Sequence, residues 1–300
     1  MRWGDFRRSD NVEDRRGDGG GGFGGGGGRI PGGRGGLGIG GLIVVGIIAW
    51  ATGINPAVLI GGAEILLGDG SAPSQQQNAP TTKRAAPDDQ MGQFAAAVLA
   101  QTEDVWVPIF KAQGQTYEEP GMVLFSGSTR SACGAAQSAM GPFYCPVDQK
   151  VYLDLSFFQE MKTRFRAPGD FVAAYVIAHE VGHHVENQIG ILGKVQARQR
   201  EVSRSEANAL SVRVELMADC LAGVWAYHAN EQWRILEDGD VEEALNAASA
   251  IGDDRLQKQS QGYTVPDSFT HGTSVQRSKW FRQGLSTGNM KQCNTFQGNI

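Results

Sequence analysis

Apolar residues recur along the second half of the chain with the spacing of amphipathic helices. In residues 92–114 the intervals include four and seven residues, at Phe94, Val98, Val105, Ile109 and Phe110. Two short runs rich in strand-forming residues, 121–127 and 150–157, lie between turn residues and predict strands. Further helices are predicted over 158–165, 173–190, about 205–230, 241–251 and 274–285. The pattern predicts an α+β fold with a small sheet ahead of a helical body.

The chain before this region follows neither pattern. Residues 1–36 are rich in arginine and glycine and poor in aliphatic side chains, which predicts a disordered tail. Residues 37–62 carry no charge and reach the length of a membrane-spanning helix. The arginines before them favour a cytoplasmic N-terminus and an exported remainder. A cleaved signal peptide is the alternative, but the apolar run begins far from Met1. Residues 63–90 form a predicted linker, which leaves 91–300 for the folded domain.

Charge and cysteine content refine this description. A formal net charge of -5 argues against nucleic acid as a partner of the folded domain, and the single "GGRGG" unit of the tail is weak support for RNA binding. Cys133, Cys145, Cys220 and Cys293 all lie on the side predicted to be exported, and an even number there fits two disulfides. Proximity favours Cys133 with Cys145, which leaves Cys220 with Cys293. Spacing alone does not determine the connectivity, and four free thiols are the alternative.

The stretch "AHEVGHHVEN" contains a His-Glu-x-x-His motif. His179 and His183 are one helical turn apart and face the same side, so both imidazoles can bind one Zn²⁺. Glu180 lies where a general base can reach a zinc-activated water. His184 points about 100° away from His183 and is predicted to be structural, and His228 is predicted to cap a helix or lie at the surface. A structural zinc is the alternative, although such sites are usually rich in cysteine.

A catalytic zinc has three protein ligands and one open position, so the motif requires a further ligand. Glu215 is the preferred candidate, because it lies 32 residues after His183 on an apolar helix where a buried acid needs a partner. Asp219, one turn later, can accept the outer N–H of a ligating histidine. In the alternative interpretation both acids lie at the surface and pair with Arg213 or Arg204. Other possible ligands, in more polar surroundings, are Glu186, Glu201 and Glu206.

The stretch "DSFTHGTSVQRSKWFRQG" places His271 in a turn and Arg277 on the helix that follows. A zinc hydrolase needs a donor near the oxyanion that forms on the scissile carbonyl, and either residue can supply one. The alternative is that Arg277 is a surface cation and that His271 begins the helix. The sequence does not decide between these readings.

Four blocks together resemble the bacterial membrane-anchored neutral zinc metallopeptidases of the YpfJ-like type. They are "CGAAQSAMGPFYCPVDQKVYLDLSFF", "FVAAYVIAHEVGHHVENQIGI", "RVELMADCLAGVWA" and "DSFTHGTSVQRSKWFRQG", and they extend over most of residues 91–300. The resemblance implies a zincin-like domain of the gluzincin type. It implies one catalytic Zn²⁺ bound by His179, His183 and Glu215, with Glu180 as base and Asp219 orienting a ligand.

The block from His271 to Arg277 is similar to the His-Pro-x-x-x-x-Arg element of membrane heat-shock and prenyl-protein zinc proteases, with Gly272 in place of proline. By the same resemblance, residues 150–157 would border the cleft and pair with an extended peptide. The sequence thus predicts a zinc metallopeptidase for peptide or protein substrates, with one span in the inner membrane and its catalytic domain in the periplasm. A non-catalytic, membrane-anchored scaffold domain is the alternative. The substrate and the oligomeric state are open.

Overall fold

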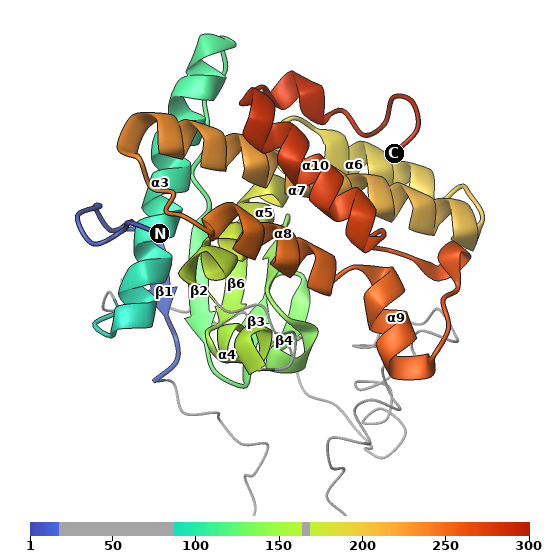
Figure 1. Cartoon of the computed structure of the whole chain (residues 1–300), viewed down its shortest axis with the longest axis horizontal. Coiled ribbons are helices and arrows are strands. Elements are labelled where there is room, and N and C mark those ends of the chain that lie inside the picture. The colour runs from blue at the N-terminus through green and yellow to red at the C-terminus, as the bar shows by residue number, and fades with distance from the viewer. Residues whose placement is uncertain (18–86, 164–168) are drawn as a thin grey trace, which may run out of the picture. The chain divides into compact units, whose positions relative to one another are not determined.

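The computed structural model describes residues 1–17, 87–163 and 169–300, in which a small sheet lies against a larger body of helices (Figure 1). The strands are β1 (Val12–Asp14), β2 (Gly121–Phe125), β3 (Ser128–Ser131), β4 (Gly134–Gln137), β5 (Phe143–Cys145) and β6 (Lys150–Asp154). The helices are α3 (Gln90–Ala112), α4 (Ser156–Thr163), α5 (Asp170–Gln188), α6 (Ile191–Gln199), α7 (Arg204–Trp233), α8 (Asp240–Ala250), α9 (Asp253–Gln261) and α10 (Ser274–Thr287). Short 3-10 turns cover Ser138–Met140, Pro266–Ser268 and Met290–Cys293.

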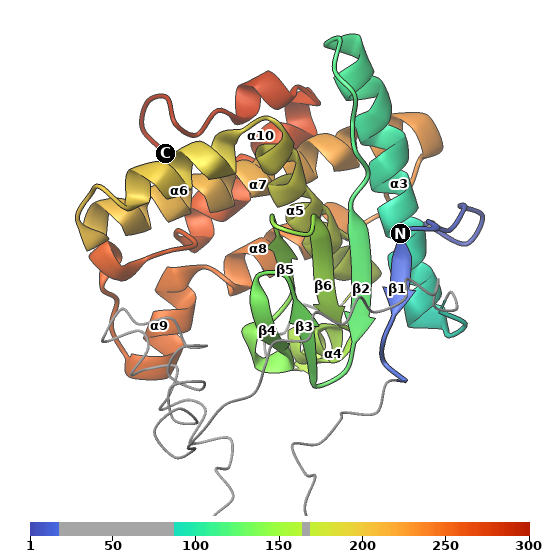
Figure 2. The same ribbon diagram turned by 180° about the vertical axis from the view of Figure 1, so that it is seen from behind.

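The main sheet has the strand order β1-β2-β6-β5, and β3 and β4 form a separate hairpin (Figure 2). β2 pairs in parallel with both β1 and β6, whereas β5 runs antiparallel to β6. Alternate side chains of the central strands point to opposite faces. One set joins the main core with the helices, namely Met122, Leu124, Val151 and Leu153. The other set forms a smaller cluster of Val123, Phe125, Tyr152 and Cys145.

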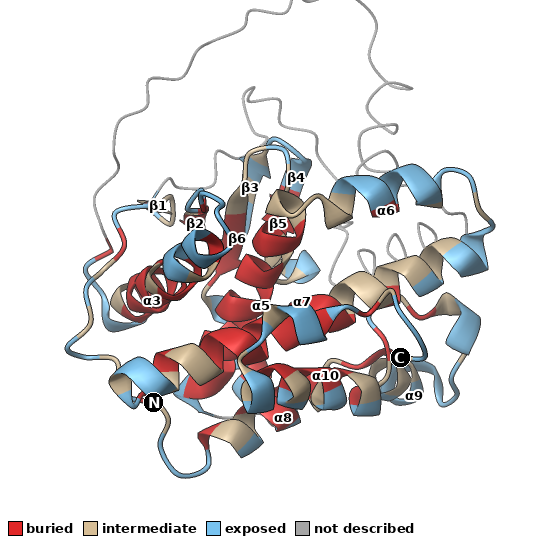
Figure 3. Cartoon of the chain, turned by 90° about the horizontal axis from the view of Figure 1, so that it is seen from above, coloured by how far each residue is buried: buried red, intermediate tan, exposed pale blue. Residues whose placement is uncertain are grey.

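The helical body is built around α5 and α7, which are buried over most of their central turns, while α6 and α9 lie at the periphery (Figure 3). The two central helices come unusually close at Gly182. A Cβ atom at this position would lie 2.9 Å from the backbone oxygen of Ala218, which is shorter than real Cβ contacts allow. Glycine at this position of α5 therefore permits the approach that brings the motif histidines next to α7.

The helices and strands predicted from the sequence are confirmed as α3, α4, α5, α7, α8, α10, β2 and β6. The sequence analysis did not predict β1, β3, β4, β5, α6 or α9. Both disulfides form with the favoured pairing, Cys133 with Cys145 and Cys220 with Cys293. The second joins α7 to the Met290–Cys293 turn, across a sequence separation of 73 residues.

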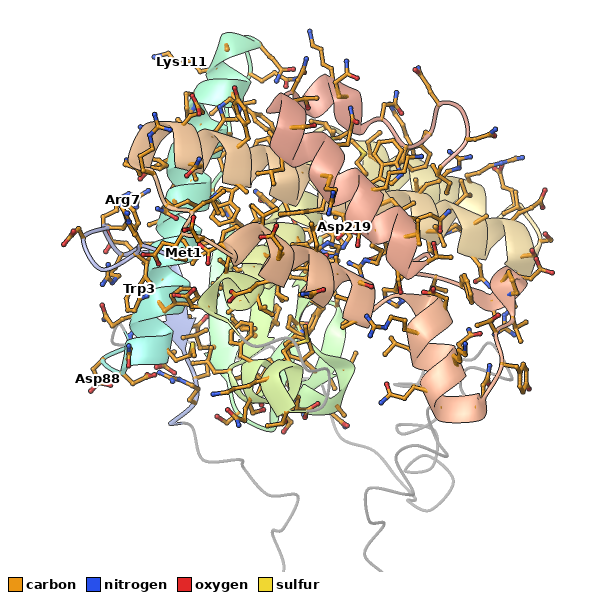
Figure 4. All side chains as sticks on the ribbon, viewed as in Figure 1. Met1, Trp3, Arg7, Asp88, Lys111 and Asp219 are labelled. Atoms are coloured by element: carbon orange, nitrogen blue, oxygen red, sulfur yellow. A yellow bond between two sulfur atoms is a disulfide. The ribbon has the colours of Figure 1, made fainter. Side chains whose placement is uncertain are left out.

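Residues 1–17 are an ordered part of the domain, so the prediction that residues 1–36 form a disordered tail is wrong for this segment. β1 adds a strand to the edge of β2, and the Trp3 ring packs edge-on against Phe94 of α3. Figure 4 shows Met1, Trp3 and Arg7 beside α3. Arg7 Nη2 donates to Oε2 of Glu103 at 2.7 Å, and this carboxylate is only 1% exposed. A buried carboxylate without a partner is costly, so the segment supplies charge and hydrogen bonds that α3 needs.

The predicted membrane span, residues 37–62, lies outside the described residues, as does most of the predicted linker. Among the residues that the structure does describe, no helix is both long and apolar enough to cross a membrane. The linker prediction extended slightly too far, because α3 begins at Gln90 and Asp89 caps it by accepting from the backbone N–H of Gly92 at 3.0 Å.

Replacing Val12 by aspartate tests whether residues 1–17 are docked in solution. Val12 is 9% exposed and pairs with Met122, so loss of its apolar burial is expected to lower the free energy of unfolding by about 2 kcal/mol. Urea unfolding of the full-length protein measures the change, with Asp10→Asn as the exposed control two positions away. Equal midpoints for the two variants would contradict the docking.

Candidate metal centre

Three side chains from α5 and α7 converge on one point. His179 and His183 lie one turn apart on α5, and Glu215 faces them from α7. One donor atom from each lies within 4.8 Å of the others. Oε2 of Glu215 is 3.2 Å from Nε2 of His179, and Oε1 is 3.6 Å from Nε2 of His183. The sequence analysis named these three residues as the ligand set, and the structure brings them together.

The spacing of these donor atoms suits a tetrahedral Zn²⁺. Two ligand atoms each about 2.0 to 2.1 Å from zinc lie about 3.3 Å apart in tetrahedral geometry. The nearest Glu215 oxygen to each histidine, Oε2 for His179 at 3.2 Å and Oε1 for His183 at 3.6 Å, lies close to that distance. Two neutral imidazoles and one carboxylate also form a donor set common in catalytic zinc sites. The residues present therefore fit the metal that the motif implies.

Each histidine is held through its other ring nitrogen by a buried carboxylate. Nδ1 of His179 lies 2.9 Å from Oδ1 of Asp219, and Nδ1 of His183 lies 2.8 Å from Oε2 of Glu186. Both carboxylates are 0% exposed. A carboxylate that accepts a hydrogen bond from Nδ1–H leaves Nε2 free to bind a metal. Asp219 thus occupies the position predicted from the sequence. Glu186, which the sequence analysis considered only as a metal ligand, contacts the ligand His183 instead.

Asp219, whose position is labelled in Figure 4, accepts hydrogen bonds from two further side chains. Arg277 donates from Nε to Oδ2 at 2.8 Å and from Nη2 to Oδ1 at 3.0 Å. The Tyr175 hydroxyl donates to Oδ1 at 2.5 Å. Arg277 is 2% exposed, so the interpretation of this residue as a surface cation is wrong. The pairing of Asp219 with Arg213 or Arg204 at the surface is wrong as well, because Asp219 is fully buried.

Burial and neighbouring charge affect these carboxyl groups differently. Burial raises the pKa of Glu180, and it raises the pKa of Glu186 to about 7. Burial also raises the pKa of Asp219, but Arg277 and then His179 outweigh it and hold that pKa at about 2. Asp219 is therefore a carboxylate at neutral pH and can accept a hydrogen bond from Nδ1–H of His179.

The convergent side chains open onto a cleft of about 530 Å³. Glu180 lines it beside the two motif histidines, and Ser138 to Tyr144 form another part of its wall. The prediction that the strand in residues 150–157 pairs with an extended peptide is wrong, because both edges of β6 are already paired, with β2 and with β5. Phe157, the last residue of that stretch, does line the cleft. β5 is the edge strand on this side of the sheet, and its residues Phe143 and Tyr144 line the cleft.

His271 also lines the cleft, on the loop before α10. Its side chain is 50% exposed, and Nδ1 lies 3.3 Å from Oδ1 of Asp253 at the start of α9. The following residue, Gly272, has φ of +87°. Proline is restricted to φ near -65°, so the loop could not keep this conformation with proline at that position. Glycine instead of proline in the His-Gly-x-x-x-x-Arg block thus reflects a different local backbone.

The remaining histidines and acidic candidates have structural roles. His184 is buried and lies 2.9 Å from the Tyr144 hydroxyl, as expected for a structural residue, and burial lowers its pKa to about 4. Nε2 of His228 lies 2.7 Å from the carbonyl oxygen of Gly288. Glu201 pairs with Arg198 at the surface, and Glu206 forms the capping box of α7.

Two other features of the described residues resemble sites but lack this chemistry. Asp170, Asp240 and Glu243 form an acidic group, but the Met1 ammonium already lies 2.9 Å from Asp170 and 3.3 Å from Asp240. A second hollow, of about 620 Å³, lies among Trp3, α3, α4 and the start of α5, and no histidine lines it. The cleft with His179 and His183 is therefore the candidate site.

The fold and the site define the class: an α+β protein in which a His-Glu-x-x-His helix and a carboxylate on a second helix form one three-residue centre. Sequence comparison identifies the family. The profile of the family described as "Putative neutral zinc metallopeptidase" matches residues 1–296. The chain belongs to this family. The match includes residues 1–17, which the structure shows docked on the domain.

Two relatives illustrate the similarity. "Uncharacterized protein YpfJ" of Escherichia coli (strain K12) is 51% identical over 302 residues, which cover 100% of both chains. "Uncharacterized protein Rv2575" of Mycobacterium tuberculosis (strain ATCC 25618 / H37Rv) is 46% identical over 202 residues, 64% of this chain and 66% of that protein. No solved structure was found to match the chain.

The contact between Glu186 and His183 predicts a role in metal affinity. Glu186→Gln removes the charge that holds Nδ1 of His183, so zinc affinity is expected to fall about 10-fold. Competition with a chelating dye measures the affinity, and Glu201→Gln, at a surface glutamate in the loop between α6 and α7, is the control. Equal affinity in Glu186→Gln and the unaltered protein would show that the contact does not support the metal site.

Proposed function

We propose that this protein is a zinc-dependent metallopeptidase that hydrolyses peptide bonds with Glu180 as general base. The observation that carries the proposal is the convergence of His179, His183 and Glu215 at tetrahedral spacing, beside Glu180 in an open cleft. The family description supports the same class of activity. The substrates proposed are peptides or proteins.

The arrangement assigns a role to each group in the cleft. Zinc bound by the three ligands would supply Lewis acidity, which makes water acidic near neutral pH and polarises a carbonyl group. Glu180 would take the proton of the attacking water and return it to the leaving amine. Its burial raises its pKa, which favours a group that both accepts and donates a proton near neutral pH. Asp219 and Glu186 would keep the Nε2 atoms of the histidines directed at the metal.

The two residues of the His-Gly-x-x-x-x-Arg block have different proposed roles. His271 lines the cleft, where its ring can donate to the oxyanion that forms on the scissile carbonyl. Arg277 directs Nε and Nη2 at Asp219 and reaches His179 through that carboxylate. We therefore propose Arg277 as a positioning residue for the metal centre, in place of the oxyanion donor considered from sequence.

Zinc content and hydrolysis together test the proposal. The unaltered protein and Glu180→Gln are expected to bind one zinc each, and Glu215→Ala is expected to lose it, because it removes one of three ligands. Hydrolysis of a mixed peptide library, followed by mass spectrometry, should fall at least about 100-fold in Glu180→Gln.

Two outcomes would argue against a peptidase. Undiminished hydrolysis in zinc-loaded Glu180→Gln would remove Glu180 from the base role. A protein that binds no zinc and cleaves no peptide would favour the alternative of a scaffold domain.

For the folded domain we propose an extracytoplasmic location at the inner membrane of a bacterial cell. The support is the pair of disulfides, since such bonds persist mainly in oxidising compartments. The anchor predicted at residues 37–62 lies outside the described residues, and a single crossing there would separate β1 from β2, which the sheet pairs.

Thiol alkylation of cells lysed directly into denaturant tests the location, since Cys145, Cys220 and Cys293 are buried in the folded domain. All four cysteines are expected to resist alkylation until a reductant is added, because they are paired in an oxidising compartment. Mass spectrometry of the alkylated protein counts the modified residues. Full alkylation without a reductant would place the domain in a reducing compartment.

A further inference from the structure

One carboxylate fixes the loop that carries His271. Asp253 is the first residue of α9 and is 8% exposed. Its Oδ2 accepts the backbone N–H groups of Thr270 at 2.7 Å, His271 at 2.6 Å and Gly272 at 3.0 Å. The backbone N–H of Asp253 donates in return to the carbonyl of Gly272 at 2.9 Å. The position of His271 at the cleft therefore depends on Asp253.

The second carboxylate oxygen of Asp253 is directed at the imidazole. Oδ1 lies 3.3 Å from Nδ1 of His271, and the hydroxyl of Thr270 lies 3.1 Å from the same nitrogen. Both oxygens can accept a hydrogen bond from Nδ1–H. With Nδ1 held in this way, Nε2 is the ring nitrogen left for the cleft that His271 lines.

The charges around the ring favour its protonated form. Burial lowers the pKa of His271, but Glu215 and Asp253 outweigh burial and raise it, while Arg277 opposes them. Of the two carboxylates, Glu215 is a proposed metal ligand, and a bound cation would offset its charge. Asp253 would then be the carboxylate that continues to favour the imidazolium.

We propose that Asp253 is the positioning residue for His271, holding the imidazolium through Nδ1–H so that Nε2–H points into the cleft. On the proposed function, this N–H meets the oxyanion of the scissile carbonyl, and the proposal rests on that function only for this last step. The ring orientation and its protonation concern the protein alone.

Asp253→Asn separates the two tasks of the carboxylate. The asparagine oxygen can still accept the three backbone N–H groups, whereas its NH₂ group cannot accept from Nδ1. The matched control is Asp254→Asn. Asp254 Oδ1 accepts from the backbone N–H of Ser274 at 2.7 Å and from its hydroxyl at 2.8 Å. Its carboxylate therefore binds the first residue of α10.

NMR titration of the His271 ring in the metal-free protein is the first measurement. The ring pKa is expected to lie above the ordinary 6.5 in the unaltered protein, to fall by about one pH unit in Asp253→Asn and to stay unchanged in Asp254→Asn. A value below 6.5 in the unaltered protein overturns the proposal, even if Asp253→Asn does not fold. An unchanged value in folded Asp253→Asn overturns it too.

A double-mutant cycle on the zinc-loaded enzyme tests the functional step. Asp253→Asn is expected to lower kcat about 10-fold with little change in KM and with zinc content unaltered. In a His271→Ala background the same substitution should cost less than about 2-fold, because Asp253 acts through the ring. Additive losses would show that Asp253 only supports the loop. If the ring titrates as expected but no variant cleaves peptides, the peptidase proposal fails and the positioning of His271 stands.

Discussion

The buried carboxylate of Asp219 is the interaction on which the centre of the molecule depends. It is 0% exposed and accepts from Tyr175 on α5 and from Arg277 on α10, while Asp219 itself belongs to α7. An isolated charge at this depth would be expensive, so the three helices can pack only in the arrangement that brings its partners together. The same arrangement presents His179 to Glu215. The stability of the core and the geometry of the metal centre are thus set by one group.

Helix periodicity and the His-Glu-x-x-His motif predicted much of the fold from the sequence. Long apolar segments such as α3 and α7 are buried over many consecutive residues, and their length and apolar content indicate helices. β1 and β5 escaped notice because each has only three residues, too few to show an alternation. β1 also lies in a segment rich in arginine and glycine. Its order comes from partners far along the chain, such as Glu103, and composition does not record them.

The residues of the site also fall into those that local sequence patterns predict and those that they do not. His179, Glu180 and His183 follow from the local pattern, and Glu215 with Asp219 from acids on an apolar helix. Glu186 lies three residues after His183 on the same helix, so its contact was open to prediction from helix geometry. The contact between Asp253 and His271 could not be predicted in this way. The two residues are 18 positions apart, and no regular spacing relates them. Such tertiary contacts are visible only once the chain is folded.

The pairing of β1 with β2 has a consequence for membrane sidedness. Two strands can share hydrogen bonds only if both are in one compartment, so residues 1–17 must reach whichever side holds the folded domain. A single crossing between them, with the N-terminus retained in the cytoplasm and the domain exported, cannot coexist with this sheet. Export of the domain would also require translocation of Arg7, Arg15 and Arg16, against the usual retention of basic segments. In the folded domain these three arginines form ion pairs with Glu103, Glu13 and Asp14, respectively.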